Sequence, residues 1–233
     1  MPDRPDPRIQ SLEQLKAATM ACRECPIGEM ASQSVIGEGK LKARLMLVGE
    51  QPGDEEDRRG EPFVGPAGRL LDRALEAAGV DRTTLYVTNA VKHFKWEPRG
   101  KRRLHKTPAQ REIEACRPWL EAEIAAVHPE VICCLGATAA KALLGPDFRV
   151  SLSRGKLVKS PYAPRVFATL HPSAVLRVRG AAERAAAFKS LVRDLALMRS
   201  TAPARPARRS DRPGSSAPRS GPNRLLPSGR RAG

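Results

Sequence analysis

Short, almost continuously apolar runs alternate along this chain with longer segments of helical periodicity. The length of the apolar runs suits strands of a parallel sheet that is covered on both faces. The intervening segments place apolar residues three and four positions apart, as helices packed on such a sheet do. This alternation predicts a single α/β domain: an open, doubly wound, mostly parallel sheet with flanking helices. We expect strands at 43–50, 85–91, 130–135 and 165–170, and helices at 11–19, 68–79, 108–127, 136–145 and 181–199.

The folded domain should span residues 1–199. The segment 200–233 is rich in Pro, Ser, Gly and Arg, and such a composition buries too little apolar surface to fold. We therefore expect a disordered basic tail, which carries +7 of the net charge of +16 and leaves about +9 on the folded part. A basic body favours a polyanionic partner, although composition alone does not separate DNA from RNA.

Polar side chains follow three of the predicted strands. The carboxyl ends of parallel strands meet at one edge of a sheet, which is where doubly wound folds bind their ligands. Each of these residues alone is also an ordinary turn or cap residue, but agreement among three strand ends favours a site. They are Glu50, Gln51 and Asp54 after the first strand, Asn89 at the end of the second, and His171 and Ser173 after the last.

Several motifs here resemble those of a known family. Gly49-Glu-Gln-Pro-Gly53 and His171-Pro-Ser173 resemble the paired motifs of the uracil-DNA glycosylase superfamily. The phrases EPFVGPAGRLLD and LYVTNAVKHF resemble its iron–sulfur branch, family 4. The basic loop GKRRLHKTP resembles that of UdgX-type members, which have Ile where this chain has Leu104. The resemblance covers residues 22–198 and implies a glycosylase that excises uracil from DNA.

The resemblance also implies roles for the residues at the strand ends. Asn89 should read the uracil edge through its amide, which can donate and accept at once. Phe63 should stack on the base, and the backbone around Gln51 should contact the carbonyl oxygens of the base. His171 should stabilise the negative charge that develops on the leaving uracil. The structural alternative is a strand-end cap for Asn89 and a core aromatic for Phe63.

His105 carries the most specific expectation. From spacing alone, a histidine in a basic loop is a solvated residue or a phosphate contact. In proteins resembling UdgX, the matching histidine attacks the sugar C1′ once uracil leaves, which gives a covalent protein–DNA adduct. A neutral imidazole is a competent nucleophile near pH 7. Glu50, Gln51 and Asp54 are candidates to orient or deprotonate His105 or to position water, and the sequence does not divide these roles.

The expected partner is uracil-containing DNA, preferably single-stranded but also double-stranded. Basic side chains should neutralise phosphates, and an apolar wedge, Leu176, should fill the gap left by the flipped base. The sequence contains no run of 18 apolar residues, so we expect no membrane-spanning helix. We expect a monomer in the bacterial cytoplasm, associated with the nucleoid. The candidate DNA contacts are Lys101, Arg102, Arg103, Ser173, Leu176 and Arg177.

Five cysteines without an export signal favour metal or cluster ligation over disulfides. Cys22 and Cys25 form a C-x-x-C pair, while Cys116 lies in the longest central helix and Cys133 in the next strand. Four thiolates suit zinc or a [4Fe–4S] cluster, and the resemblance favours the cluster. Because adjacent strand residues face opposite sides, only one of Cys133 and Cys134 can be the fourth ligand. We choose Cys133.

Three other functions stay open. An ordinary family 4 glycosylase would hydrolyse the bond and release a free abasic site, with His105 contacting only phosphate. A non-catalytic module would bind uracil or abasic DNA as a sensor. A basic zinc-binding RNA protein is the most distant alternative, and an iron and sulfide assay would distinguish it.

Overall fold

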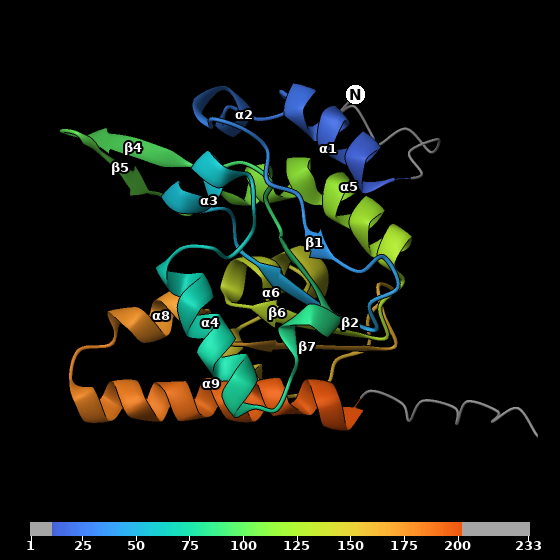
Figure 1. Cartoon of the computed structure of the whole chain (residues 1–233), viewed down its shortest axis with the longest axis vertical. Coiled ribbons are helices and arrows are strands. Elements are labelled where there is room, and N and C mark those ends of the chain that lie inside the picture. The colour runs from blue at the N-terminus through green and yellow to red at the C-terminus, as the bar shows by residue number, and fades with distance from the viewer. Residues whose placement is uncertain (1–10, 202–233) are drawn as a thin grey trace, which may run out of the picture. The chain divides into compact units, whose positions relative to one another are not determined.

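A five-stranded sheet forms the centre of the computed structural model, which describes residues 11–201 of the chain (Figure 1). The strand order is β1-β3-β2-β6-β7, in which β1 is antiparallel to β3 and the other neighbours are parallel. This arrangement confirms the predicted open, mostly parallel α/β sheet. The strands are β1 (Glu38–Gly39), β2 (Leu45–Gly49), β3 (Leu85–Asn89), β6 (Val131–Leu135) and β7 (Arg165–Thr169).

Helices cover both faces of this sheet, as Figure 1 shows. Alternate residues of β2 point to opposite faces, so Met46 and Val48 pack into one core layer while Leu47 packs into the other. The first layer contains α1 (Leu12–Ala21), α5 (Gln110–Val127) and α6 (Ala137–Leu144). The second contains α4 (Pro66–Ala77), α8 (Pro172–Arg177) and α9 (Ala181–Thr201). The shorter helices are α2 (Ile27–Met30), α3 (Asp54–Arg59), η1 (Arg82–Thr84, a 3₁₀ turn) and α7 (Val150–Ser153).

A separate two-stranded hairpin projects from the body (Figure 1). It consists of β4 (Trp96–Arg99) and β5 (Arg102–His105), in a segment for which the sequence predicted only a basic loop. Arg99 pairs with Arg102, which leaves a two-residue turn. Gly100 adopts a φ of 59° in this turn, a conformation that hairpin turns of this length require and that glycine adopts without strain. The pairing places His105 at the foot of the hairpin, opposite Trp96.

Two helix ends differ from the prediction. Helix α5 has Ala109 as its N-cap, whose backbone N–H donates to the carboxylate of Glu112 at 2.6 Å, and it begins two residues later than expected. Helix α9 continues to Thr201, into the first residues of the predicted tail. The rest of that tail lies outside the described residues.

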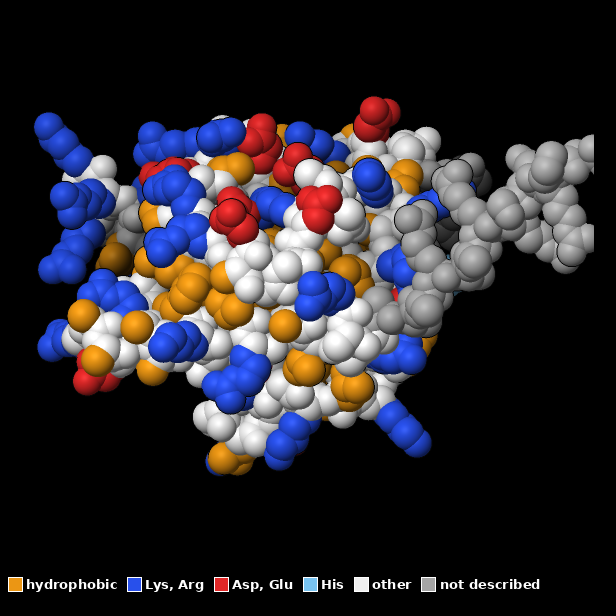
Figure 2. All heavy atoms as spheres, turned by 60° about the horizontal axis from the view of Figure 1, so that its bottom comes forward, with side chains coloured by type: hydrophobic (Ala, Val, Ile, Leu, Met, Phe, Trp, Pro, Cys, Tyr) orange, Lys and Arg blue, Asp and Glu red, His pale blue; other side chains and the backbone are white. Residues whose placement is uncertain are grey.

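The surface of the described part is basic. Figure 2 turns the α9 end of the molecule forward and shows many more Lys and Arg than Asp and Glu side chains on that face. None of the helices within residues 11–201 has the length and apolar character needed to cross a membrane.

Candidate active site

A cleft of about 1100 Å³ opens where β2, β3, β6 and β7 end. In the strand order, β3 lies on one side of β2 and β6 lies on the other. The cleft opens at this reversal of strand order, which is where a doubly wound fold is expected to bind its ligand. The cleft brings together every predicted catalytic and uracil-binding residue, although these residues come from segments far apart in the sequence. They are Glu50, Gln51, Asp54, Phe63, Asn89, His105 and His171, and the cleft is also lined by Thr138, Ser173, Leu176 and Arg177.

Asn89 presents an unpaired amide oxygen to this cleft. The side chain is 2 % exposed, and its Oδ1 finds no hydrogen-bond partner among residues 11–201. A Cβ on the neighbouring Gly49 would lie 2.3 Å from that oxygen and 2.5 Å from the ring of Phe63. Only glycine therefore leaves room for both side chains. Since an unpaired buried acceptor is costly, the amide is suited to a ligand that brings its own donor.

The backbone of Asn89 is held by a buried ion pair. Lys92 Nζ donates to the backbone oxygen of Asn89 at 2.6 Å and to Glu123 Oε2 at 2.5 Å. Both charged side chains are fully buried. Such a pair is stable only when its remaining polar atoms are satisfied, and Glu123 also accepts from Thr88 and from the backbone N–H of Gly37. The amide of Asn89 therefore projects from a rigid support.

Phe63 is held in a strained backbone conformation. Its φ is 58°, in the left-handed region that non-glycine residues rarely adopt, and its side chain is 6 % exposed. A Cβ on Gly68 would lie 1.7 Å from the Phe63 backbone oxygen, so α4, which begins at Pro66, has room only for glycine as its third residue. The Phe63 ring centroid lies 6.1 Å from that of His171. Strain of this kind persists where the surrounding structure requires one side-chain placement.

His171 is held as a neutral imidazole with one defined tautomer. The backbone N–H of Ser173 donates to His171 Nδ1 at 3.1 Å, so that nitrogen carries no proton. Burial, and secondarily the charge of Arg177, lowers the pKa of His171 to about 4. The ring is therefore neutral at pH 7, with its proton on Nε2. Ser173 holds His171 with both its N–H and its hydroxyl, which lies 2.8 Å from Nδ1, and its contact with DNA stays a prediction.

His105 lies at the mouth of the cleft beside two of the three residues proposed to assist it. Its Nε2 is 3.4 Å from Glu50 Oε1 and 3.0 Å from Gln51 Nε2, and its ring centroid is 5.9 Å from that of Phe94. Burial lowers the pKa of His105 below its ordinary 6.5, against the opposing effect of Glu50. The imidazole is therefore uncharged at pH 7 and retains the lone pair that a nucleophile needs.

Gln51 and Glu50 make different contacts. The Gln51 amide donates to the backbone oxygens of Lys95 and Lys106 at 3.2 and 3.0 Å and accepts from Lys95 N–H at 3.0 Å. It thus ties both ends of the hairpin to the β2 strand end. Among residues 11–201, the Glu50 carboxylate accepts from no backbone N–H, and its Oε1 faces His105.

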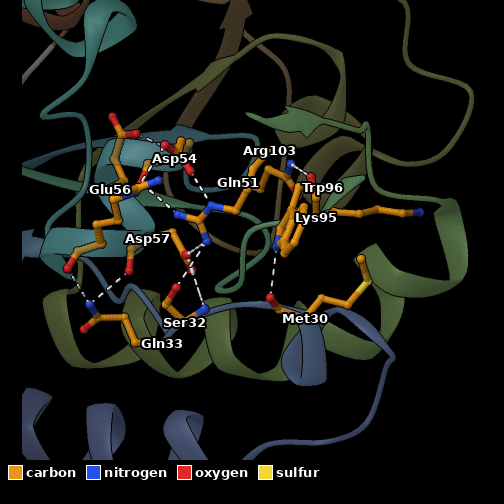
Figure 3. Close-up of polar contacts among 12 residues, drawn as sticks. Met30, Ser32, Gln33, Gln51, Asp54, Glu56, Asp57, Lys95, Trp96 and Arg103 are labelled. Atoms are coloured by element: carbon orange, nitrogen blue, oxygen red, sulfur yellow. Dashed lines mark hydrogen bonds and ion pairs between the residues drawn. The ribbon is translucent and has the colours of Figure 1, made fainter. Parts of the chain in front are cut away.

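Arg103 anchors the hairpin to α3 (Figure 3). Its guanidinium donates to the carboxylate of Asp54, to Asp57 Oδ2 at 2.5 Å and to Ser32 Oγ at 3.1 Å. The Arg103 side chain is 15 % exposed and that of Asp57 is fully buried. We predicted Arg103 as a phosphate contact and Asp54 as a partner of His105, but the structure binds these two side chains to each other. The sequence does not predict this ion pair, because an arginine can bind phosphate or a carboxylate and an aspartate can assist a histidine or bind an arginine.

Aromatic rings complete the anchor. The Arg103 guanidinium carbon lies 5.4 Å from the ring centroid of Phe94 and 5.5 Å from that of Trp96, within the range of cation–π attraction. Trp96 also donates from Nε1 to the Met30 backbone oxygen at 2.9 Å (Figure 3). By contrast, Lys101 and Arg102 at the hairpin tip are exposed, as a contact with phosphate requires.

A group of thiols lies on the α5 side of the sheet. Cys22, Cys25 and Cys116 pack against the same core layer. In addition to burial, the negative charges that Cys22 and Cys25 carry when ionised contribute to a raised pKa of Cys116. Burial raises the pKa of Cys116 to about 12, and the backbone N–H of Lys92 donates to its Sγ at 3.2 Å. Among residues 11–201, no three His, Cys, Asp or Glu side chains lie close enough to hold a single metal ion.

Cys133 does not join these three thiols. It lies in the core layer of α4 and α9, on the opposite face of the sheet from Cys116. Cys134 does face the α5 side, in the same core layer as Cys116. Cys133, which we predicted as the fourth ligand, is therefore not placed with the C-x-x-C pair.

The structure instead brings His93 to this region. His93 is 4 % exposed, and a Cβ on Gly28 would lie 2.6 Å from the Cys22 backbone oxygen and 3.8 Å from His93 Cε1. His93 was not among the site residues predicted from the sequence. The available signal was a histidine directly after a buried strand, in a chain with only four histidines.

Comparison with known proteins agrees with this geometry. Residues 36–196 match the uracil DNA glycosylase superfamily. The chain is 36 % identical over 176 residues to a type-4 uracil-DNA glycosylase of Sulfurisphaera tokodaii, covering 72 % of this chain and 77 % of that protein. It is 37 % identical over 173 residues to a type-4 enzyme of Thermotoga maritima, covering 74 % and 86 %. A third type-4 relative, from Pyrobaculum aerophilum, is 38 % identical over 173 residues, covering 71 % and 85 %.

Proposed function

Because the chain belongs to the uracil-DNA glycosylase superfamily, we propose that it excises uracil from DNA and then bonds through His105 to the remaining sugar. The observation that carries the covalent step is the position of His105, whose Nε2 lies 3.4 Å from Glu50 Oε1 at the mouth of the cleft that contains Asn89. A phosphate contact would not need a neutral imidazole beside a carboxylate.

Recognition of uracil depends on Asn89 and Phe63. A base must leave the stack before its bond to the sugar can be reached, and a flipped base is read by its pairing edge. Uracil offers a donor at N3 and an acceptor at O4, which match the unpaired Oδ1 and the amide hydrogens of Asn89. Cytosine has an acceptor at N3 and would leave that oxygen unpaired. The Phe63 ring provides an apolar surface on which the base stacks.

Excision breaks the bond between uracil N1 and C1′, with the electron pair going to N1. The His171 Nε2–H donates a hydrogen bond to the uracil oxygen on which negative charge develops. Its low pKa keeps it a neutral donor, so it stabilises the anion without transferring a full proton. The uracil anion takes its proton from solvent after release.

Capture forms a bond between His105 Nε2 and C1′. The unprotonated Nε2 supplies its lone pair to C1′, so the ring proton stays on Nδ1 and the ring becomes an imidazolium cation. The Glu50 carboxylate, whose Oε1 lies 3.4 Å from Nε2, stabilises this positive charge, and the Nδ1 proton is then lost to solvent. The protein then stays attached and turns over once. Lys101 and Arg102 at the hairpin tip, with Leu176 and Arg177 at the cleft rim, contact the DNA on either side of the flipped nucleotide.

A hydrolytic glycosylase is the second candidate, favoured by the type-4 relatives. In that case water, not His105, attacks C1′, and a free abasic site results. The test is to incubate the protein with a labelled, uracil-containing single-stranded oligonucleotide, heat it in detergent and separate the products on a denaturing gel. A retarded, heat-stable band supports capture. Strand cleavage at the uracil only after alkali, without a retarded band, would show hydrolysis.

Removal of the hairpin anchor should slow capture. Arg103→Met keeps much of the apolar stem but leaves Asp57, which is fully buried, without its cationic partner. We expect the rate of adduct formation to fall by about 10- to 100-fold, because His105 is held less firmly beside Glu50. The neighbouring Arg102→Met is the matched control, since Arg102 is exposed. Equal effects of the two variants would contradict the anchoring role.

The proposal includes a [4Fe–4S] cluster held by Cys22, Cys25, Cys116 and His93. Each ligand of such a cluster binds a different iron, so its ligands lie further apart than those of a single metal ion. Three thiols and one imidazole converge on the α5 side, and imidazole replaces thiolate in some iron–sulfur centres. The residues thus fit the group. Its contribution is structural, since it ties the N-terminal segment to the body.

Iron content tests this ligand set. We expect about four irons and four acid-labile sulfides per chain, with most of the iron lost in His93→Ala and retained in His93→Cys. Cys133→Ala should keep its iron, because Cys133 lies on the other face of the sheet. Iron lost from Cys133→Ala and kept in His93→Ala would restore the ligand set expected from sequence.

A further inference from the structure

Thr138 contacts the carboxylate that faces His105. It is the second residue of α6, it is 4 % exposed, and its Oγ1 donates to Glu50 Oε2 at 2.6 Å. The other carboxylate oxygen, Oε1, is the one that lies 3.4 Å from His105 Nε2. The two oxygens of Glu50 therefore have different partners.

This contact removes the freedom that Glu50 would otherwise have. The Glu50 backbone is fixed, since its carbonyl oxygen accepts from Val91 N–H at 3.0 Å. The side chain still has three rotatable bonds and is 22 % exposed, so without a partner it would sample several rotamers. A short hydrogen bond to a carboxylate is among the stronger ones available, and it fixes the plane of the carboxylate as well as its position.

The start of α6 also holds the second histidine of the site. Gly136 has a φ of 89°, and a Cβ there would lie 2.9 Å from His171 Cβ. The α6 N-terminus thus packs against His171 and binds Glu50 through Thr138. None of the site residues predicted from the sequence lies in this segment.

We infer that Thr138 is a positioning residue, whose hydroxyl holds Glu50 so that its free oxygen stabilises the positive charge that develops on His105 during capture. The inference rests on the proposed covalent step. The Thr138 hydroxyl touches neither DNA nor the reacting atoms. It acts through Glu50, and its loss should slow bond formation to C1′ more than it slows uracil release.

The variants Thr138→Val and Thr138→Ser separate the hydroxyl from the rest of the side chain. Valine keeps the branched shape and removes the donor, while serine keeps the donor. For Thr138→Val we expect the maximal single-turnover rate of adduct formation to fall by about 10- to 100-fold. The DNA concentration that gives half of this rate should change little, and more of the product should be free abasic DNA. Thr138→Ser should stay within about 3-fold of the original protein.

A matched control is available elsewhere in the fold. Thr169 Oγ1 donates to Asp194 Oδ2, also at 2.6 Å and also buried, and Asp194 lies on α9. Thr169→Val therefore loses a comparable hydrogen bond without affecting Glu50. We expect this variant to lower the thermal unfolding temperature but to leave the ratio of adduct to free abasic DNA unchanged.

The outcomes distinguish this inference from the proposed function. A gel on which the original protein gives no adduct would overturn both. Adduct formation by the original protein with an unchanged rate and product ratio in Thr138→Val would overturn only the role of Thr138. Equal losses in Thr138→Val and Thr169→Val, or failure of Thr138→Ser to retain the rate, would also overturn it.

Discussion

His105→Ser should abolish the covalent adduct while uracil is still excised. We expect the adduct rate to fall by more than about 10³-fold, because a serine hydroxyl carries no lone pair of comparable reactivity at neutral pH. The excision residues Asn89 and His171 are unchanged, so uracil should still leave and water should take its place at C1′. Quantifying the adduct and the alkali-sensitive strand in the same reaction measures both products.

His128→Asn is the matched control for loss of a histidine. His128 is the exposed C-cap residue of α5, has a φ of 56° and is not among the residues that line the cleft. Asparagine tolerates that backbone conformation. This variant should form the adduct at the original rate. A His105→Ser protein that still forms a heat-stable adduct would show that another side chain attacks the sugar.

The fold was largely predictable because the sheet is buried on both faces. Strands β3 and β6 are buried at every residue, and such strands leave a continuous apolar signal in the sequence. The polar residues at the carboxyl ends of β2, β3 and β7 were predictable for a related reason. In a parallel sheet their carboxyl ends meet at one edge, so Glu50, Asn89 and His171 had to come close together whatever the connecting segments did.

The parts that escaped prediction depend on side-chain partners rather than on periodicity. The hairpin β4–β5 is short and polar, and its position depends on the contacts of Arg103 with Asp54 and Asp57. Nothing in the sequence distinguishes an arginine bound to carboxylates from one that binds phosphate. His93 escaped for a similar reason, because its approach to Cys22 depends on the absence of a side chain at Gly28.

Asn89→Asp should reduce uracil excision by about 10²- to 10⁴-fold. The substitution preserves shape and the acceptor oxygen, but it replaces the amide donor with a second oxygen that faces the uracil O4 acceptor. Leaving buried polar groups unpaired in a recognition site has effects of this size. Single-turnover release of uracil from a labelled oligonucleotide measures the change, and thermal unfolding of the variant checks that the fold is intact.

The comparison of Asn89→Asp with His105→Ser is more informative than the loss of activity in either variant alone. If Asn89 reads the base before any bond breaks, Asn89→Asp should lower excision and adduct formation by the same factor. His105 acts only after uracil has left, so His105→Ser should lower the adduct alone. An Asn89→Asp protein that excises uracil within a few-fold of the original rate would show that the unpaired Oδ1 has another purpose than uracil recognition. Recognition would then depend on Phe63 and the backbone near Gln51, while the assignment of capture to His105 would stand.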